Sequence, residues 1–299
     1  MPRVSVVIPC WNAADFIERT LDSVAAQTYR DFEVVAVDDG STDKTQDVVE
    51  RVLKARGLPG RSLRQENKKI AGARNAGIRA ASGELIAFLD HDDAWYPEKL
   101  ARCVAELDAD PGAGLVCHQE KVVKDGREVG VTRNGPWTER MYESLLFDGN
   151  ALSPSAVVAR KPKLFEAGLF RENPEFNTVE DYDLWMRLAR VCRMRFLGEI
   201  LGEYALVERG ASNKIVYHTS NLESLLSDHF RNFPDPDARI RALMGRRRGV
   251  MCRSAAGLLL AQGELAESGR YARRAVSEFP ADWKNWAALA QWTAKRVLP

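Results

Sequence analysis

Three short apolar runs, each closed by polar residues, constrain the fold of this 299-residue chain most strongly. The runs span residues 4–8, 32–37 and 85–89. They are rich in valine, isoleucine and leucine, which is typical of strands buried on both faces. Apolar residues at helical spacing lie between and after them and predict helices near 15–27, 43–56, 71–80 and 97–107. This alternation predicts an α/β fold with a doubly wound, mostly parallel sheet.

The pattern changes in the second half of the chain. Residues 115–123 and 127–131 alternate around Lys124-Asp125-Gly126, which predicts a β-hairpin. A further helix is expected over 181–191. The last part of the chain predicts three helices, near 238–261, 264–278 and 282–296. We therefore expect an α/β domain followed by a C-terminal helical extension.

A change in charge marks the boundary between these two parts. Residues 231–299 contain 13 Lys and Arg but 6 Asp and Glu, whereas the chain as a whole carries a net charge of +1. The change falls near Pro234 and Pro236, which resist helix formation. We therefore predict a domain over residues 1–230 and a basic helical extension over residues 231–299.

The composition excludes several classes of protein. With a net charge of +1, the chain lacks the overall basic character of a nucleic-acid-binding protein, so we expect no nucleic-acid partner. Five cysteines without a Cys-x-x-Cys pair suit a reducing compartment. We find no apolar run near the ~18 residues of a membrane span. The N-terminus also lacks the ordered regions of a signal peptide, so we expect a cytoplasmic protein.

Polar side chains follow each of the three predicted strands. The strands end in Pro9-Cys10-Trp11-Asn12, in Asp38-Asp39 and in Asp90-His91-Asp92-Asp93. In open α/β sheets, ligands bind beyond the carboxyl ends of the strands, and these ends share one rim of the sheet. The sequence therefore predicts a ligand site on that rim.

Two interpretations of residues 90–93 stay open at this point. Carboxylates this close repel one another unless a cation joins them, and oxygen ligands suit Mg²⁺ or Mn²⁺. A solvated turn that caps the next helix explains the pattern about as well, although the buried strand before it favours the metal site. Asp39 is similarly either a turn residue or a carboxylate that accepts the imide N–H of a uracil or thymine ring.

Five motifs in a fixed order give a specific resemblance. They are VSVVIPCWN, VVAVDDGSTDKT, ARNAGIRAASGE, IAFLDHDDAW and EDYDLWMRLA. Over roughly residues 3–215, the chain resembles the family 2 glycosyltransferases of the GT-A fold. The resemblance implies a metal-dependent inverting enzyme that moves a sugar from a nucleotide-diphospho-sugar, UDP- or dTDP-linked, to a hydroxyl of a glycan or lipid-linked acceptor.

The resemblance also assigns nucleotide-sugar-binding roles near the first three strands. It implies that Pro9 and Trp11 line the nucleobase pocket, with Asn12 beside them. It implies that Asp39 binds the base and that Arg74 approaches the nucleotide or its phosphates. One departure concerns Asn67-Lys68-Lys69, where the family often has Asn-x-Gly. A lysine in place of glycine reshapes this loop or adds a cation beside the diphosphate.

The metal and catalytic roles fall on two carboxylate motifs. The family's Asp-x-Asp corresponds to Asp90 and Asp92, which implies that Asp92 is the main ligand of Mg²⁺ or Mn²⁺. Asp90 then contacts the ribose or the water shell of the metal, and His91 lines the pocket. The family's Glu-Asp pair corresponds to Glu180-Asp181, which implies that Asp181 is the catalytic base. Taken alone, the same pair fits two first-turn helix residues.

Two other functions remain as alternatives. A nucleotidyltransferase also uses carboxylates and Mg²⁺, but the residues after the first strand lack a glycine- and lysine-rich phosphate loop. A non-catalytic scaffold would keep the fold, yet the carboxylates of the motifs are intact. By analogy alone, residues 209–213 form a loop over the site.

The basic extension suggests a further partner. Arg246-Arg247-Arg248 is either a solvated helix face or a contact with anionic lipid headgroups. Helical geometry places Trp292 nearly opposite Trp283, so we expect the face with Trp283 and Trp286 to pack and Trp292 to be exposed. Our hypothesis is peripheral contact with the inner face of an anionic membrane.

Overall fold

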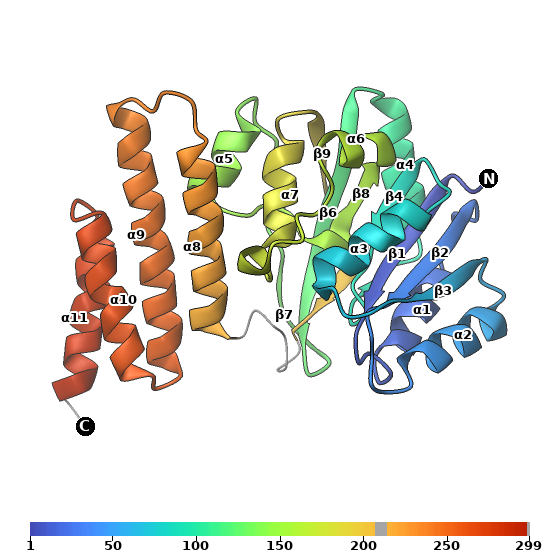
Figure 1. Cartoon of the computed structure of the whole chain (residues 1–299), viewed down its shortest axis with the longest axis horizontal. Helices are drawn as coiled ribbons and strands as arrows, with labels where there is room; N and C mark the ends of the chain where they lie inside the picture. Colours follow the sequence, from blue (N-terminus) through green and yellow to red (C-terminus); the bar gives the residue numbers. More distant parts are fainter. Residues whose placement is uncertain (207–213, 298–299) are drawn as a thin grey trace. The chain divides into compact units, whose positions relative to one another are not determined.

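The computed structural model describes residues 1–206 and 214–297 (Figure 1). Its contacts separate two compact units. The first comprises Met1–Tyr142 and Asn150–Glu208, and the second comprises Glu143–Gly149 and Arg209–Pro299. The predicted loop at 209–213 lies outside the described residues. In the described residues, no helix combines the length and the apolar character that crossing a bilayer requires.

Among the residues that the structure describes, a nine-stranded sheet forms the core of the first unit. Its strand order is β3-β2-β1-β4-β8-β6-β9-β5, and β7 pairs with β6. The first four strands in this order are parallel, whereas β8 is antiparallel to both of its neighbours. The strands are β1 (Val4–Cys10), β2 (Phe32–Asp38), β3 (Gly60–Arg64), β4 (Leu85–Phe88), β5 (Ala94–Trp95), β6 (Ala113–Lys124), β7 (Arg127–Val131), β8 (Val157–Arg160) and β9 (Arg193–Ala205).

Helices cover both faces of the parallel part. One face of β1, with Val4, Val6 and Ile8, packs against α1 and α2. On the other face, Gly77 of α3 lies against Val7 so closely that an added Cβ would come within 2.4 Å of the valine Cγ1 atom. The helices of this unit are α1 (Ile17–Ala25), α2 (Thr45–Arg56), α3 (Lys69–Ala80), α4 (Lys99–Ala109), α6 (Lys161–Glu166) and α7 (Glu180–Leu188), with 3-10 turns η1 (Pro154–Ala156) and η2 (Pro174–Phe176). The glycine therefore permits the close approach of α3 that positions the site.

The predicted α/β class is confirmed, and so are the three apolar strands and the hairpin. The sequence missed β3, β5, β8 and β9. In β3 the residues GRSLR are partly or fully exposed, and only one of them is strongly apolar, so they carry no buried-strand signal. The antiparallel strands arise from long-range pairing that periodicity does not reveal.

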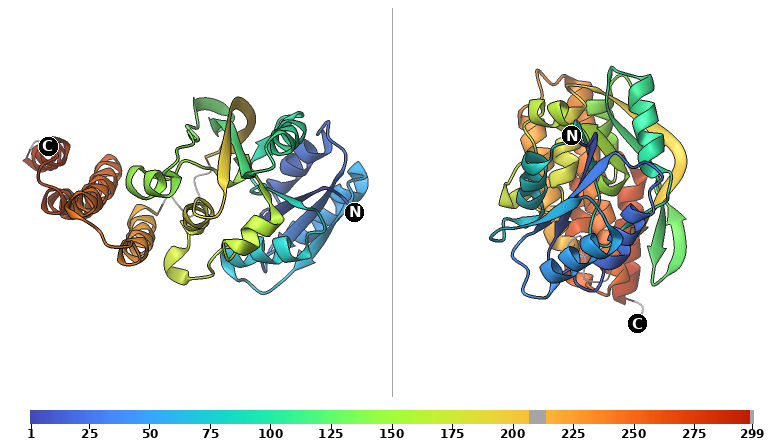
Figure 2. Two further views of the ribbon diagram at one scale, coloured as in Figure 1. Left: turned by 90° about the horizontal axis from the view of Figure 1, so that it is seen from above. Right: turned by 90° about the vertical axis from the view of Figure 1, so that its right-hand side faces the viewer.

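The second unit is helical. Its helices are α5 (Met141–Asp148), of which the first two residues belong to the first unit, α8 (Ile215–Arg231), α9 (Ala238–Ala261), α10 (Leu265–Glu278) and α11 (Trp283–Val297). The last three match the predicted helices within about one residue, and α9 and α11 both pack against α10 (Figure 2). The packing boundary precedes α8, whereas the predicted boundary between residues 230 and 231 falls at the last residue of this helix. The predicted boundary was placed where the charge of the chain changes, whereas the packing boundary lies before α8 because α8 packs with α9.

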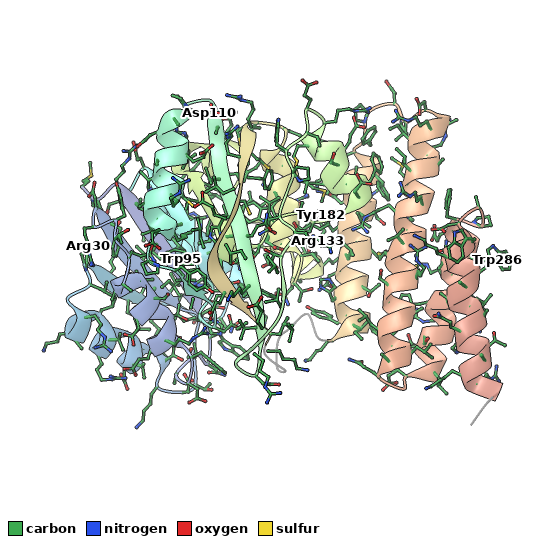
Figure 3. The ribbon with its side chains drawn as sticks, turned by 180° about the vertical axis from the view of Figure 1, so that it is seen from behind. Arg30, Trp95, Asp110, Arg133, Tyr182 and Trp286 are labelled. Carbon is green, nitrogen blue, oxygen red and sulfur yellow. The ribbon has the colours of Figure 1, made fainter. Side chains whose placement is uncertain are left out.

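The prediction for the tryptophans of α11 is wrong. Trp292 packs on Gly269, where an added Cβ would come within 2.3 Å of the indole ring, and its Nε1 donates to the Leu265 carbonyl at 2.7 Å. Trp283 and Trp286 are 71% and 52% exposed, and Figure 3 shows Trp286 on α11. The packed face of α11 instead includes the buried Asn285, whose side-chain Nδ2 atom donates to the carbonyl of Ala275.

Candidate active site

The ends of β1 and β2 form one hydrogen-bonded edge. Their parallel register pairs Cys10 with Asp38, and the Asp39 amide donates to the Cys10 carbonyl at 2.8 Å. Asn12 takes a left-handed backbone, with φ of 49°, and its side-chain oxygen accepts from the Thr42 amide at 2.9 Å. Trp11 stands beside this edge with 53% of its surface exposed. The predicted residues of the nucleobase pocket are thus brought together, with Trp11 accessible to a ligand.

Asp39 lies at the base of this edge. It is 3% exposed, and its Oδ1 atom accepts hydrogen bonds from Gln65 Nε2 at 2.7 Å and from the Lys68 amide at 2.8 Å. Asn67 Nδ2 donates to the Asp39 carbonyl at 3.0 Å. In the described residues, the Oδ2 atom of Asp39 accepts no hydrogen bond. This arrangement leaves one oriented acceptor for the N–H of a base.

The turn at residues 90–93 is held from inside by Asp93. Its carboxylate accepts from Ser155 Oγ at 2.6 Å and from the Ala205 amide at 2.8 Å. The same serine hydroxyl accepts from the Asp90 amide at 3.0 Å. Burial raises the pKa of Asp93, and the charge of Asp92 adds to the effect. Asp93 therefore shapes the turn, while Asp90 and Asp92 stay partly exposed.

His91 connects this turn to the end of β1. Its Nδ1 atom lies 3.2 Å from the carbonyl oxygen of Pro9. Thr20 fixes the turn from α1, because its hydroxyl lies 2.8 Å from the carbonyls of both His91 and Asp93. The nucleobase residues and the Asp90–Asp92 motif therefore belong to one rigid edge.

A buried arginine joins this edge to the second carboxylate motif. Arg74, on α3, is 1% exposed, and its Nη2 atom donates to both oxygens of Asp90, at 2.7 and 3.0 Å. Its Nη1 atom donates to Glu180 Oε1 at 2.7 Å. Burial alone would lower the pKa of Arg74, but the carboxylates of Asp90, Glu180 and Asp181 raise it overall. The arginine thus stays charged in the interior.

Glu180 and Asp181 begin α7, as predicted. Burial raises the pKa of Glu180 to about 7, against the opposing effect of Arg74. Burial also raises the pKa of Asp181, with Arg74 again opposing and Asp90 adding to the rise. A carboxylate with a raised pKa is a stronger base, which suits the removal of a proton from a hydroxyl.

The family model of glycosyl transferase family 2 matches residues 5–165, more than half of the chain. The chain is 32% identical over 218 residues to the amylovoran biosynthesis glycosyltransferase AmsB of Erwinia amylovora, which covers 70% of this chain and 71% of that protein. The chain belongs to glycosyltransferase family 2. It is also 35% identical over 170 residues to an uncharacterised glycosyltransferase of Nostoc. The aligned region covers 55% of this chain and 52% of that relative, so this chain spans about half of the relative's length.

Solved structures show the same fold. A mannosyltransferase from Pyrobaculum calidifontis, in complex with GDP-Man and Mn²⁺, has a TM-score of 0.63 at 24% identity and covers 99% of this chain and 86% of its own. S. aureus TarS 1-349, in complex with UDP-GlcNAc, has a TM-score of 0.61 at 19% identity and covers 99% of this chain and 92% of its own. The predicted GT-A fold is therefore confirmed.

In the structure of this family 2 chain, Arg74 contacts two carboxylates, whereas the sequence resemblance implies an approach to the nucleotide. Direct contact with a nucleotide or its phosphates stays a prediction. The guanidinium is buried and binds two carboxylates through its Nη1 and Nη2 atoms, while its Nε atom has no hydrogen-bond partner among the described residues. The observed contacts make Arg74 a positioning residue that holds Asp90 and Glu180.

The donor set of this family 2 site fits a small divalent cation. In the described residues, no group of three or more His, Cys, Asp or Glu side chains is already arranged around one metal position. Burial raises the pKa of Asp92, and the nearby Asp90 adds to the rise, so a bound divalent cation would offset the cost of ionising its carboxylate. Mg²⁺ and Mn²⁺ are commonly held by one or two carboxylates together with substrate phosphates, which Asp90 and Asp92 suit.

Several residues that shape the site of this family 2 protein were missed by the sequence reasoning. Ser155 holds both ends of the Asp90–Asp93 turn, and Gln65 binds Asp39. Trp95, labelled in Figure 3, donates from its Nε1 atom to the Ser155 carbonyl at 2.7 Å. Buried Lys99 lies 3.4 Å from the centre of the Trp95 ring, and burial lowers its pKa to about 8. These residues reach the site through tertiary packing, and although Trp95 ends the motif IAFLDHDDAW, that motif gives no sign of its contacts with Ser155 and Lys99.

Proposed function

We propose that this chain transfers a sugar, with inversion, from a nucleotide-diphospho-sugar to a hydroxyl of a glycan or lipid-linked acceptor. The observation that carries the proposal is the joining of Asp181 and Asp90 into one buried charge network through Arg74 and Glu180. The interactions of Asp181 with Arg74 and Asp90 support its proposed role as a base beside the Asp90–Asp92 motif. Family membership supports the same reaction class.

In the proposed reaction, Asp181 accepts the proton of the acceptor hydroxyl as its oxygen attacks the anomeric carbon. The new glycosidic bond forms as the bond between that carbon and the diphosphate oxygen breaks, and the nucleoside diphosphate leaves. Asp90 and Asp92 are the residues that would hold Mg²⁺ or Mn²⁺. Such an ion stabilises the charge of the leaving diphosphate. Asp39 and Trp11 orient the base.

The bases held by the structural relatives differ, since one is in complex with GDP-Man and the other with UDP-GlcNAc. The unpaired Oδ2 atom of Asp39 supports a pyrimidine, UDP- or dTDP-linked. The relative from Erwinia carries amylovoran biosynthesis in its name, which supports an acceptor in cell-surface polysaccharide biosynthesis. The cytoplasmic location expected from the sequence is part of this proposal.

A nucleotide panel tests the proposal. We expect one of UDP-, dTDP-, GDP- and CDP-sugars to raise the unfolding temperature of the wild-type protein in the presence of Mn²⁺, because ligands that bind the native state stabilise it by mass action. We expect Asp92→Asn to lose this Mn²⁺-dependent rise and Asp108→Asn, on the exposed side of α4, to keep it.

The other outcomes separate the alternatives. No rise with any donor, for a folded protein, contradicts the proposed transfer and favours a scaffold. Release of pyrophosphate from a nucleoside triphosphate and a sugar phosphate would instead identify a nucleotidyltransferase.

We also propose that the second unit contacts an anionic membrane peripherally. The exposed Trp283 and Trp286, three residues apart on α11, support this hypothesis, because tryptophan favours membrane interfaces. Arg246 is exposed and available to lipid headgroups, but Arg247 is 7% exposed, which corrects the expectation that the whole arginine run is available. Each basic residue near the surface would contribute about 1 kcal/mol.

Binding to vesicles of phosphatidylglycerol and phosphatidylcholine measures this contact. We expect the double variant Trp283→Ala/Trp286→Ala to bind several-fold more weakly than the wild type. Val129→Ala, which removes a comparably exposed apolar residue from β7, should bind like the wild type. Equal binding of the wild type and the double variant would exclude these tryptophans as the contact.

A further inference from the structure

Tyr204, near the end of β9, is held against the turn at residues 90–93. The amide of the next residue, Ala205, donates to Asp93 Oδ1 at 2.8 Å. β5, which directly follows this turn in the sequence, pairs antiparallel with β9. On its other side, β9 pairs parallel with β6, and Val122 lies opposite Tyr204. The backbone of Tyr204 is therefore fixed by two strands and by the turn that carries the candidate metal ligands.

The alternation of side chains along β9 gives the direction of the tyrosine. Neighbouring residues of a strand point to opposite faces of the sheet, and residues two apart share a face. On one face, Glu203 accepts from the Tyr96 hydroxyl at 3.2 Å. On the other face, a Cβ added to Gly202 would lie 3.4 Å from Trp95 Cδ1. Tyr204 shares the face of Gly202, so it points to the side of β9 where Trp95 supports the site.

The hydroxyl of Tyr204 is influenced by carboxylates from both acidic motifs of the site. Burial raises the pKa of this hydroxyl, and nearby negative charges raise it further; they belong to Asp93, Asp90, Asp92 and Asp181. The phenol therefore stays protonated at neutral pH. Ionised carboxylates only accept hydrogen bonds, whereas a protonated phenol donates one. Tyr204 thus brings a donor to a part of the site that is otherwise rich in acceptors.

This donor is available to a ligand. In the part of the chain that the structure describes, the hydroxyl of Tyr204 forms no hydrogen bond. Its side chain is partly buried, so a ligand can still reach it. The buried cation of the site, Arg74, is by contrast engaged with Asp90 and Glu180. A buried tyrosine hydroxyl usually has a hydrogen-bond partner, so we expect a ligand in the site to supply one.

The carboxylates near Tyr204 indicate which part of a nucleotide-sugar it meets. In the proposed reaction, Asp92 holds the metal beside the diphosphate, and Asp181 takes the proton of the acceptor hydroxyl. The transferred sugar lies between these two positions, because its anomeric carbon is joined to the diphosphate and is attacked by the acceptor. The charges of both carboxylates act on Tyr204, so its hydroxyl lies near the place of the sugar. The hydroxyl groups and the ring oxygen of a sugar can accept a hydrogen bond from a phenol.

We propose that Tyr204 donates a hydrogen bond to the sugar of the nucleotide donor and contributes to the choice of that sugar. This inference rests on the proposed function, since it takes the ligand of the site to be a nucleotide-sugar. It adds a specificity-determining residue from β9, which lies outside the five sequence motifs.

Calorimetric titration of the full chain in the presence of Mn²⁺ tests the inference with two ligand pairs, UDP-GlcNAc with UDP and GDP-mannose with GDP. If the nucleotide panel favours another donor, that donor and its nucleoside diphosphate are used. Tyr204→Phe removes only the hydroxyl. We expect it to bind the preferred nucleotide-sugar about fivefold more weakly, the size of one hydrogen bond, and to bind the nucleoside diphosphate as the wild type does. Tyr96→Phe, the same change on the opposite face of β9, should bind both ligands as the wild type does.

Three results would overturn the inference. An unchanged affinity of Tyr204→Phe for the nucleotide-sugar would exclude the hydrogen bond. An equal loss for the nucleoside diphosphate would place the contact on the diphosphate instead, and an equal loss in Tyr96→Phe would indicate a general structural effect. Unchanged binding of the nucleoside diphosphate by Tyr204→Phe also shows that this variant is folded. A wild-type protein that binds neither nucleotide-sugars nor nucleoside diphosphates contradicts the proposed function as well, whereas wild-type binding with an unaffected Tyr204→Phe contradicts the role of Tyr204 alone.

Discussion

Asp181→Asn lowers the rate of sugar transfer by about 10²–10⁴-fold, the usual contribution of a general base. Asparagine keeps the size of the side chain but cannot accept the proton of the acceptor hydroxyl. Nucleotide binding should stay as in the wild type, because Asp39, Asp90 and Asp92 are unchanged. The measurement is initial-rate kinetics with the donor that the nucleotide panel identifies. A variant that retains more than about a tenth of the wild-type rate would exclude Asp181 as the base.

The pH profile gives a second measure of the same role. Burial raises the pKa of Asp181 above its ordinary value, with Arg74 opposing the rise. The base must be ionised to act, so kcat/KM falls as the pH decreases through this raised pKa. The acidic limb should therefore lie at higher pH than an unperturbed aspartate would give. The residual activity of Asp181→Asn should lack this limb.

Arg74→Gln destabilises the fold by about 3–5 kcal/mol, because it leaves Asp90 and Glu180 without their buried cation. Chemical denaturation of the wild type and the variant measures the loss. Adding Glu180→Gln to Arg74→Gln should recover part of the loss, since one of the two stranded carboxylates becomes neutral. Arg64→Gln is a control on a half-exposed arginine, also paired with a buried aspartate, and should cost less. A loss below about 1 kcal/mol for Arg74→Gln would contradict the central role of this arginine.

Local signals in the sequence accounted for the parallel half of the sheet. The runs that became β1, β2 and β4 are continuous and apolar, and their polar ends lie at the rim that parallel packing dictates. The helix that begins at Glu180 was also predicted, since its apolar stripe is regular. The antiparallel strands β8 and β9 were missed, because their pairing depends on partners far along the chain.

The candidate site was predicted as a set of motifs, and its internal connections were not. The sequence identified Asp90 and Glu180-Asp181 separately but gave no sign that Arg74 lies between them, since contacts over 16 and 106 residues leave no local pattern. Ser155 was missed for the same reason. The error at Trp292 shows the limit of helical geometry, which gives relative directions on a helix but not the face that packs.

The reversal of strand direction at β4 and β8 has a consequence for how such an enzyme can diversify. Residues 1–93 supply Trp11, Asp39, Asp90 and Asp92, the proposed donor half, whereas Asp181 comes from the later chain. The two halves meet side by side in the sheet, and Ser155 of the later half holds the Asp90–Asp93 turn of the earlier one. Arg74 crosses this seam and ties the donor half to Glu180. A chimera that exchanges the later half of the chain must therefore keep a carboxylate at the Glu180 position, because Arg74 would otherwise lose one of its ion-pair partners.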